Sequence, residues 1–560
     1  MTQIGGARYS RQTGTWSVPL SWQACLALRG LFGAELEIGP ELSKWAFHER
    51  SARIQPAMSL RDALYPTVEN PVLDKVEYGD VYKLFPYQRV DVEFLTTTGR
   101  ALLANEPGLG KTGAAIRTLQ VLDEQQRQPF PALVVCPNSL KFTVWEREIF
   151  QWAGDDLRVQ VVDGSASKRR KALAEVAEVY IMNWESVRLH TRMAPYGSIE
   201  LSETEKEEKE LNGLGIRTVI MDEAHRLKDP KAKQTRAMWH VCHQAEFRYA
   251  LTGTPVTSNI GDLWSLLHAV DPDGFPTKSK FLDRYATKSF NRFGGMDITG
   301  INPYNQDELF SLIDPVIRRV PKKAALPQLP DKLPVQYRET PMTPKQQKAY
   351  DQMAASMIAM LNELLVAPNA LSQLTRLAQF AAASAEIDEN GKVHLSNPSA
   401  KVDDLIDLLG EMGEAPLVVA AVSRQLIELA AAKLKDLGVS FGLVTGAQSP
   451  FERAEAVRWF QEGKIRVIML TLGAGAEGIT LTRADTMLFM QEDFSEVKNL
   501  QAQDRIYRIG AEGHQAIRII KQVTPGSVEE RKVQLLAEKR GRMEEIIRDE
   551  QTLLKLLGGK

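Results

Sequence analysis

Cysteine, long apolar runs and excess charge are all scarce in this sequence. The three cysteines, Cys25, Cys136 and Cys242, are too few and too scattered for a disulfide framework or a cysteine-based zinc site. Apolar runs such as residues 132–136 are far too short to cross a bilayer, and the first residues contain no apolar signal core. We therefore expect no membrane association and a cytoplasmic protein, or a nuclear one if the chain is eukaryotic.

The charge of the chain is nearly balanced, with 69 basic and 71 acidic residues and a formal net charge of −2. Any binding of nucleic acid must therefore come from a local groove and not from global attraction. Hydrophobic residues make up 44% and charged residues 25% of the 560 residues, which excludes fibrous and disordered classes. A chain of this length has room for about three to four domains.

Short apolar runs alternate with helical stretches in two parts of the chain. They lie at 101–104, 132–136, 178–182, 218–221 and 248–251, and again at 416–422, 441–445, 466–470 and 486–490. Continuous apolar strands separated by helices are typical of parallel sheets covered on both faces. The pattern predicts an α/β fold with two lobes.

These changes in pattern predict five segments. Residues 1–80 form a small accessory domain with a strand at 15–19 and a helix at 21–32, and we expect Trp16 and Trp22 in its core, with stacking on unpaired bases as the alternative. The other segments are a first lobe at 81–335, a helical insertion and linker at 336–395 with a turn at 389–399, a second lobe at 396–527, and bracing helices at 528–560.

The stretch ANEPGLGKT at 104–112 follows an apolar run and precedes a helical stretch. Strand, glycine-rich loop and helix are the context in which backbone N–H groups bind phosphate, and Gly108 and Gly110 supply the loop. In this pattern Lys111 reaches the β- and γ-phosphates and the Thr112 hydroxyl binds Mg²⁺. The first glycine of the usual pattern is Asn105 here. The stretch predicts ATP and Mg²⁺ as cofactors.

Two carboxylates end the apolar run of TVIMDEAH at 218–225. Phosphoryl transfer needs one group for the metal and one for the attacking water, and we assign these roles to Asp222 and Glu223. We expect His225 to couple the site to the rest of the molecule. Thr252 and Thr254 of YALTGTP, at another predicted strand end, offer hydroxyls for the same coupling role.

Two arginines stand three residues apart in QAQDRIYRIG at 501–510 of the second lobe. On a helix Arg505 and Arg508 would share one face. An arginine inserted into a nucleotide site stabilises the charge on the γ-phosphoryl group as it transfers. We therefore add both arginines to the predicted catalytic set.

These motifs, in this order, resemble those of superfamily 2 helicase-type ATPases. Flanking stretches narrow the resemblance to the Swi/Snf-type DNA translocases over roughly 84–535, among them FPYQ at 85–88, DEAHRLKD at 222–229, LTGTPVTSN at 251–259 and LTLGAGAEGITLTRAD at 470–485. The resemblance implies two RecA-like lobes with ATP between them and duplex DNA across both. It also implies that Gln88 reads the adenine, that Gln501 completes the ATP site, and that Gly478 lies at the lobe interface.

The DNA contacts that we expect come partly from the resemblance and partly from local charge. Lys168, Arg169 and Arg170 belong to a run of four basic residues that is either a solvated helix or a contact to phosphate. Pro137 and Thr471 are further candidate DNA contacts.

Four positions depart from the family pattern. Phe494-Ser495-Glu496 replaces the usual Trp-Asn-Pro, Ala511 replaces a glutamine, Asp91 replaces a glycine, and Trp145 is shifted by one residue relative to Pro137. None of these changes touches the predicted catalytic carboxylates or arginines.

Three functions stay open at this point. The first is an ATP-driven translocase or remodeller of duplex DNA, acting on forked or branched DNA with annealing activity, because YSRQTGTWSVPLSWQACLALRGL at 9–31 is similar to the small domain of annealing helicases. The second is a strand-separating DNA or RNA helicase. The third is a catalytically weak DNA-binding scaffold. We expect a monomer when free and DNA, duplex or forked, as the partner, and the sequence does not identify protein partners. Because few modules are appended to the predicted motor, we expect a bacterial or phage protein.

Overall fold

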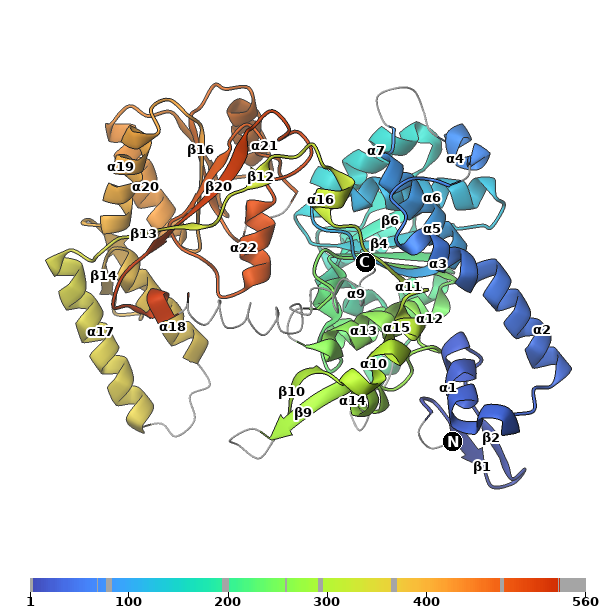
Figure 1. Ribbon diagram of the computed structural model, residues 1–560. Helices are drawn as coiled ribbons and strands as arrows, with labels where there is room; N and C mark the ends of the chain where they lie inside the picture. Colours follow the sequence, from blue (N-terminus) through green and yellow to red (C-terminus); the bar gives the residue numbers. More distant parts are fainter. Residues whose placement is uncertain are drawn as a thin grey trace. The chain divides into compact units, whose positions relative to one another are not determined.

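The apolar runs form two parallel sheets in the computed structural model (Figure 1). The structure describes residues 4–67, 69–76, 83–193, 201–256, 259–290, 296–363, 370–473, 478–531 and 533. The chain divides into two compact units between Ala325 and Leu326. The predicted α/β fold with two lobes of parallel sheet is confirmed, and the finer domain boundaries remain predictions.

The first unit is built on a seven-stranded sheet in the order β11-β3-β8-β7-β4-β6-β5, all of it parallel. Its strands are β3 (Arg100–Leu103), β4 (Ala132–Cys136), β5 (Val159–Val161), β6 (Val179–Asn183), β7 (Thr218–Asp222), β8 (Phe247–Leu251) and β11 (Ile317–Arg318). The runs predicted as strands are all present, whereas β5 and β11 were missed because three and two residues are too few to show a pattern.

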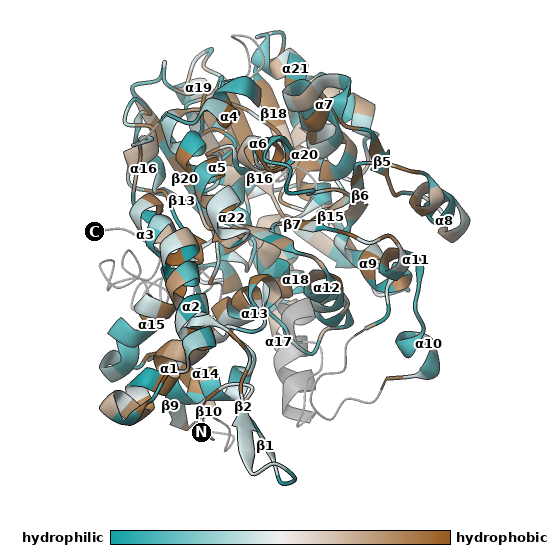
Figure 2. Cartoon of the chain, turned by 90° about the vertical axis from the view of Figure 1, so that its right-hand side faces the viewer, coloured by the Kyte–Doolittle hydropathy of each residue, from teal (hydrophilic) through white to brown (hydrophobic). Residues whose placement is uncertain are grey.

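Helices cover both faces of this sheet. Those of the first unit are α1 (Trp22–Phe32), α2 (Pro40–Glu49), α3 (Gln55–Arg61), α4 (Pro71–Val76), α5 (Pro86–Thr98), α6 (Lys111–Glu124), α7 (Arg147–Ala153), α8 (Ala166–Ala174), α9 (Trp184–His190), α10 (Glu203–Lys206), α11 (Glu210–Gly213), α12 (Lys233–Gln244), α13 (Ile260–Val270), α14 (Lys278–Tyr285), α15 (Gln306–Ile313) and α16 (Lys322–Ala325). Hydrophilic colours mark the surface helix α10, in the acidic stretch 200–210, in Figure 2.

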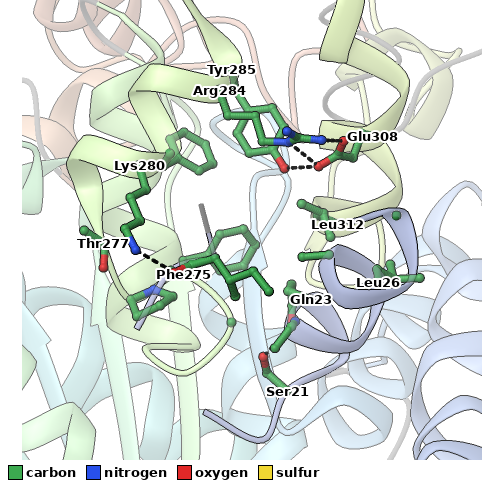
Figure 3. Close-up of a pocket in the computed structure, with 18 of the residues that line it drawn as sticks. Ser21, Gln23, Leu26, Phe275, Thr277, Lys280, Arg284, Tyr285, Glu308 and Leu312 are labelled. Atoms are coloured by element: carbon green, nitrogen blue, oxygen red, sulfur yellow. Dashed lines mark hydrogen bonds and ion pairs between the residues drawn. The ribbon is translucent and has the colours of Figure 1, made fainter. Parts of the chain in front are cut away.

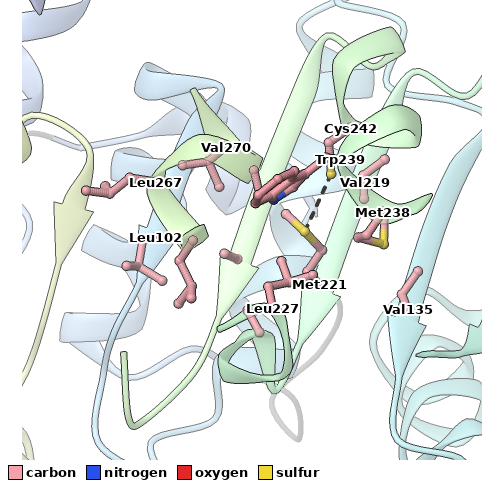
Figure 4. Packing of buried hydrophobic residues seen from close by; sticks show 14 of the residues in the cluster. Leu102, Val135, Val219, Met221, Leu227, Met238, Trp239, Cys242, Leu267 and Val270 are labelled. Carbon is pink, nitrogen blue, oxygen red and sulfur yellow. Dashed lines mark hydrogen bonds between the residues drawn. The ribbon is translucent and has the colours of Figure 1, made fainter. Parts of the chain in front are cut away.

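Successive strand residues enter different cores because side chains alternate across a sheet. Leu102 packs with helices α12 and α13 in one core, which Figure 4 shows around Met221 and Trp239, whereas Ala101 and Leu103 pack with α5, α6 and α7 in the other. Both faces are therefore apolar, which explains the continuous apolar runs in the sequence.

The second unit contains another parallel sheet of seven strands, in which β12, β20, β19, β16, β18 and β17 follow one another and β13 also pairs with β20. The strands are β12 (Asp331–Lys332), β13 (Gln336–Glu339), β16 (Leu417–Ala421), β17 (Phe441–Val444), β18 (Val467–Thr471), β19 (Thr486–Phe489) and β20 (Ala516–Val523). Sequence reasoning missed β20 because Arg518, Lys521 and Gln522 interrupt its apolar run.

The helices of the second unit include the predicted helical stretch 343–384. They are α17 (Pro344–Glu363), α18 (Ala370–Ala382), α19 (Ala400–Glu411), α20 (Arg424–Asp436), α21 (Pro450–Gln461) and α22 (Glu496–Gln503). The predicted turn at 389–399 is only partly right, because it contains β15 (Val393–Ser396), which forms a hairpin with β14 (Ser384–Ile387). The predicted bracing helices at 528–560 lie almost wholly outside the described residues.

The accessory segment begins with an antiparallel hairpin of β1 (Arg8–Ser10) and β2 (Thr15–Ser17), which projects from the first unit (Figure 1). The predicted strand and helix are present, but the expectation that Trp16 lies in a core is wrong. Its side chain is 40% exposed and lies against Tyr9 with ring centroids 5.2 Å apart. Trp22 is only partly buried. A two-stranded hairpin has no second layer under which an indole could be buried.

A cavity of about 320 Å³, partly open to solvent, lies between helix α1 and the helices α14 and α15 (Figure 3). The cavity wall is largely apolar, with Leu26, Phe275 and Leu312 among its residues, and Arg284 and Glu308 form an ion pair beside it. A second antiparallel hairpin, β9 (Ala286–Phe290) with β10 (Met296–Ile301), follows α14. In the described part of the chain no helix is both long and apolar enough to span a membrane.

Candidate nucleotide site

The predicted phosphate loop joins β3 to α6 in the first unit. Gly108 has φ 85° and Gly110 has φ 66°, left-handed conformations that glycine adopts without a steric penalty. Gly110 immediately precedes the first turn of α6. The backbone N–H groups of the loop therefore lie at the N-terminus of the helix, where the helix dipole is positive. This is the backbone geometry that phosphate binding requires.

The Lys111 side chain folds back over this loop. Its Nζ donates to the carbonyl oxygens of Asn105 at 2.7 Å and Glu106 at 3.3 Å. Thr112 follows in the first turn of α6, partly buried. Both residues of the predicted phosphate and Mg²⁺ set therefore stand at the amino end of one helix.

Gln88 contacts the loop from helix α5. Its Oε1 accepts from the backbone N–H of Phe85 at 2.8 Å and caps the helix, while its Nε2 donates to the carbonyl oxygen of Leu109 at 3.1 Å. The side chain is only 4% exposed. The structure thus places the residue expected to read adenine directly against the phosphate loop.

Asp222 ends β7 and is held by two tryptophans. Trp145 Nε1 donates to Asp222 Oδ2 at 2.9 Å, and Trp184 Nε1 donates to the backbone carbonyl oxygen of Asp222 at 2.9 Å. The expectation that the departure at Trp145 does not touch the catalytic carboxylates is therefore wrong. Sequence reasoning missed the contact because Trp145 stands 77 residues away in the chain. Burial and the neighbouring Glu223 carboxylate raise the pKa of Asp222, and the Lys111 ammonium acts in the opposite direction.

This arrangement fits a hard cation. A partly buried carboxylate with a second carboxylate beside it favours a positive counter-charge, and carboxylate and hydroxyl oxygens are the ligands that Mg²⁺ prefers. Asp222 and Thr112 are the residues that would hold the ion. The remaining ligands of Mg²⁺ in such sites are usually water and substrate phosphate.

Glu223 is the first residue in a series of polar contacts that extends from the site to Thr254. It adopts a left-handed conformation with φ 51° and ψ 49°, which is costly for a residue with a side chain and is found mainly at functional sites. His225 Nδ1 lies 3.2 Å from Glu223 Oε2 and 3.3 Å from Thr252 Oγ1. Thr252 Oγ1 also accepts from the backbone N–H of Thr254 at 3.1 Å. The predicted coupling residues therefore lie in contact with one another.

The second unit places its predicted residues around α22. Gln501 lies on this helix, which ends at Gln503, and Arg505 and Arg508 follow in a turn. The prediction that the two arginines share a helix face is therefore wrong. Arg508 Nη1 donates to the carbonyl oxygen of Ile479 at 3.2 Å, so the turn is tied to the segment that begins at Gly478, which has φ 75°.

The predicted DNA contacts occupy different environments. Lys168 and Arg170 are exposed on α8, whereas Arg169 is partly buried and its Nε donates to His190 Nε2 at 3.0 Å. Pro137 after β4 and Thr471 at the end of β18 are both buried. These assignments remain predictions.

Comparisons with known proteins identify the family of this chain. A family model described as the SNF2-related domain matches residues 87–384, and one described as the helicase conserved C-terminal domain matches residues 400–510. The transcription regulatory protein SNF2 of Saccharomyces cerevisiae is 26% identical over 461 residues, covering 77% of this chain and 25% of that protein. The putative ATP-dependent helicase/translocase YwqA of Bacillus subtilis is 27% identical over 497 residues, covering 84% of this chain and 50% of that protein.

The chain spans only 25% to 41% of the length of the first three curated relatives. Among solved structures, the Sulfolobus solfataricus SWI2/SNF2 ATPase core in complex with dsDNA is 23% identical, with a TM-score of 0.40 and coverage of 88% of this chain and 97% of that one.

Proposed function

The chain belongs to the SNF2-related family of helicase-like ATPases, and from this premise we propose that it hydrolyses ATP to translocate along or remodel double-stranded DNA. The observation that carries the proposal is the first-unit site, in which the phosphate loop, the Asp222–Glu223 pair and the line from Glu223 to Thr254 occupy the carboxyl ends of strands of one sheet. The loop supports binding of phosphate, the carboxylate pair supports binding of a metal ion, and the contacts from Glu223 to Thr254 support coupling of the site to the rest of the lobe.

Each residue of the site has one proposed role. Backbone N–H groups of the loop and Lys111 bind the phosphates, and Gln88 recognises adenine. Glu223 positions the attacking water, and Arg505 and Arg508 stabilise the charge on the transferring phosphoryl group. Mg²⁺, held by Thr112 and Asp222, would neutralise charge on the β- and γ-phosphates. The coupling residues transmit changes at Glu223 to the rest of the lobe; they are His225, Thr252 and Thr254.

A preference for forked DNA is supported by the hairpin β1–β2. Tyr9 and Trp16 face each other across it in register, both exposed, and Arg8 and Arg11 are exposed beside them. Residues 1–34 contain Arg8, Arg11 and Arg29 and no acidic residue. Aromatic rings with nearby cations are the usual platform for unpaired bases. We therefore place recognition of unpaired DNA on this hairpin.

The test of the motor is the steady-state ATPase rate without nucleic acid and with duplex DNA, single-stranded DNA, forked DNA or RNA. We expect duplex or forked DNA to stimulate most, Lys111→Ala to abolish turnover, and Glu223→Gln to bind ATP without hydrolysing it. Normal turnover by Glu223→Gln would contradict the role of that carboxylate. Stimulation mainly by single strands or RNA would favour a strand-separating helicase, and no ATPase activity with any of them would favour the scaffold.

The test of the hairpin is Trp16→Ala. We expect it to lower the stimulation by forked DNA and to leave that by plain duplex unchanged. Trp459→Ala is the matched control, because Trp459 on α21 is exposed to a similar degree, 39%. Equal effects of the two variants on forked DNA would remove the hairpin from the proposal.

A further inference from the structure

Two of the positions that differ from the expected patterns contact each other beneath the phosphate loop. Asn105 stands where a phosphate loop usually has its first glycine, and Asp91 stands where the family usually has a glycine. Asn105 Nδ2 donates to Asp91 Oδ2 at 2.7 Å. Both residues are 0% exposed, so neither can exchange its partner for water. The two side chains therefore form a buried hydrogen-bonded pair.

Arg318 completes the pair from β11. Its Nε donates to Asp91 Oδ1 at 2.6 Å, and its side chain is 0% exposed. The other guanidinium nitrogens donate to backbone carbonyls, Nη1 to Leu60 at 2.6 Å and Arg61 at 2.8 Å, and Nη2 to Ala63 at 2.8 Å. Arg318 thus joins the end of helix α3 and the segment after it to Asp91 on α5.

Asn105 carries this connection into the nucleotide site. Its Oδ1 accepts from the backbone N–H of Val320 at 2.8 Å, and its backbone carbonyl accepts from Lys111 Nζ at 2.7 Å. The path from the Arg318 guanidinium to the Lys111 ammonium therefore consists only of Asp91, Asn105 and hydrogen bonds of 2.6 to 2.7 Å.

The hydrogen-bond directions fix the orientation of the Asn105 amide. Val320 supplies a donor and Arg318 supplies donors, so the amide at 105 must turn its Nδ2 toward an acceptor at 91. Burial raises the pKa of the Asp91 carboxyl, and Arg318 is the first of the groups that oppose this rise. One buried cation is matched by one buried carboxylate.

We propose that Asp91, Asn105 and Arg318 are positioning residues that hold the phosphate loop in its nucleotide-binding geometry and tie it to the segment 60–63. The proposal rests on the proposed ATPase function. None of the three touches the reacting atoms, since Asn105 acts through its backbone contact with Lys111. Nucleotide binding and the packing of segment 60–63 should therefore affect each other.

The test is an exchange of the two side chains. D91N alone sets two amide donors against each other, because Asn105 is already fixed by Val320, and N105D alone sets two buried carboxylates against each other. In the double variant D91N/N105D the new amide accepts from Arg318 and donates to the new carboxylate, which still accepts from Val320. Hydrogen bonds and net charge are then preserved, and only the location of the charge has moved.

The readouts are Kd for a fluorescent ATP analogue, KM and kcat for ATP with duplex DNA, and Tm. We expect each single variant to raise Kd and KM by about tenfold with a smaller change in kcat, and the double variant to return both to within about threefold of the wild type. Asp163→Asn is the control, because it removes the carboxylate partner of another buried cation, Lys141, in the same unit. We expect it to change Tm alone.

Folded single variants with wild-type Kd and KM would overturn the proposal, since the network would then be only structural. If the single variants do not fold, the double variant decides alone: it must fold and bind nucleotide within about threefold of the wild type, and failure of either kind overturns the proposal. Because Kd needs no turnover, a wild-type protein that binds nucleotide without hydrolysing it would contradict the proposed function and not this network.

Discussion

At the scale of single residues, the geometry of Asp222 depends on Trp145. The indole N–H is a donor to a partly buried carboxylate, a contact worth about 1.5–3 kcal/mol. Trp145→Phe keeps most of the ring and removes only this donor. We expect kcat for ATP to fall by about tenfold, with a higher Mg²⁺ concentration needed for half-maximal rate. Steady-state ATPase assays at varied Mg²⁺ measure both.

The matched control for this change is Trp264→Phe. Trp264 is as deeply buried in the same unit, and its Nε1 has no hydrogen-bond partner within the described structure. The control should therefore lose packing and leave the Mg²⁺ dependence unchanged. If the two variants shift the Mg²⁺ dependence equally, the Trp145 donor does not position Asp222.

A second residue, His268, makes stability depend on pH. Its ring packs against those of Trp264 and Trp239, with centroids 4.9 and 4.6 Å away, and burial lowers its pKa from 6.5 to about 4. At pH values above 6.5 the imidazole is neutral in both states. Between pH 6.5 and 4 the unfolded chain takes up a proton that the folded one excludes, so this group lowers the free energy of unfolding by up to about 1.4 kcal/mol per pH unit.

His268→Phe tests this dependence. The variant keeps an aromatic ring against the two tryptophans but loses the hydrogen bond to the Phe275 carbonyl, so we expect a lower Tm at pH 7. Its Tm should then fall less steeply than that of the wild type between pH 6.5 and 4. Thermal unfolding curves across this range provide the measurement, and parallel curves for the two proteins would show that His268 is not the source of the acid sensitivity.

At the scale of elements, helix α6 depends on a glycine where helices usually gain from alanine. A Cβ at Gly113 would lie 2.7 Å from Trp152 Cζ2, so the contact between α6 and the tryptophan of α7 requires a residue without a side chain. We expect Gly113→Ala to lower Tm, although the same change in a free helix raises stability by about 0.5–1 kcal/mol.

Gly30→Ala is the matched control in the same unit. Gly30 lies within α1, and nothing within 4 Å would meet its Cβ. Its Tm should therefore rise. A higher Tm for Gly113→Ala as well would mean that α6 and Trp152 separate at no cost.

Helices and strands also show which elements a sequence pattern can predict. Every apolar run predicted as a strand is a strand of a parallel sheet, because such runs need burial on two faces. Sequence reasoning missed strand β20 because a charged residue within an apolar run indicates an exposed segment. Lys521 lies within this strand, but it is buried and pairs with Glu492. The helix expected around Arg505 ends early because the chain turns back to bond Leu481 N–H with the Arg505 carbonyl.

At the scale of the whole molecule, each unit has hydrophobic clusters of its own. Those of the first unit draw on residues up to Ile317, and those of the second begin at Val335, among the described residues. We therefore expect two transitions in scanning calorimetry. Phe460→Ala, which empties a fully buried position of the second unit, should lower one of them by the equivalent of about 3–5 kcal/mol and leave the other in place. A single transition that shifts as a whole would contradict two independent cores.

The sequence by itself determined the local chemistry of this protein. Three features are each made of consecutive residues: the phosphate loop, the carboxylate pair and the runs that become strands. Their hydrogen-bonding and hydrophobic properties follow from neighbours a few residues away. Tertiary structure alone decided which distant residues support them. Trp145 meets Asp222 across 77 positions and Arg318 meets Asp91 across 227, because parallel strands bring remote segments to one edge of a sheet. A single sequence contains no signal for such pairings, since they arise from packing and not from local pattern.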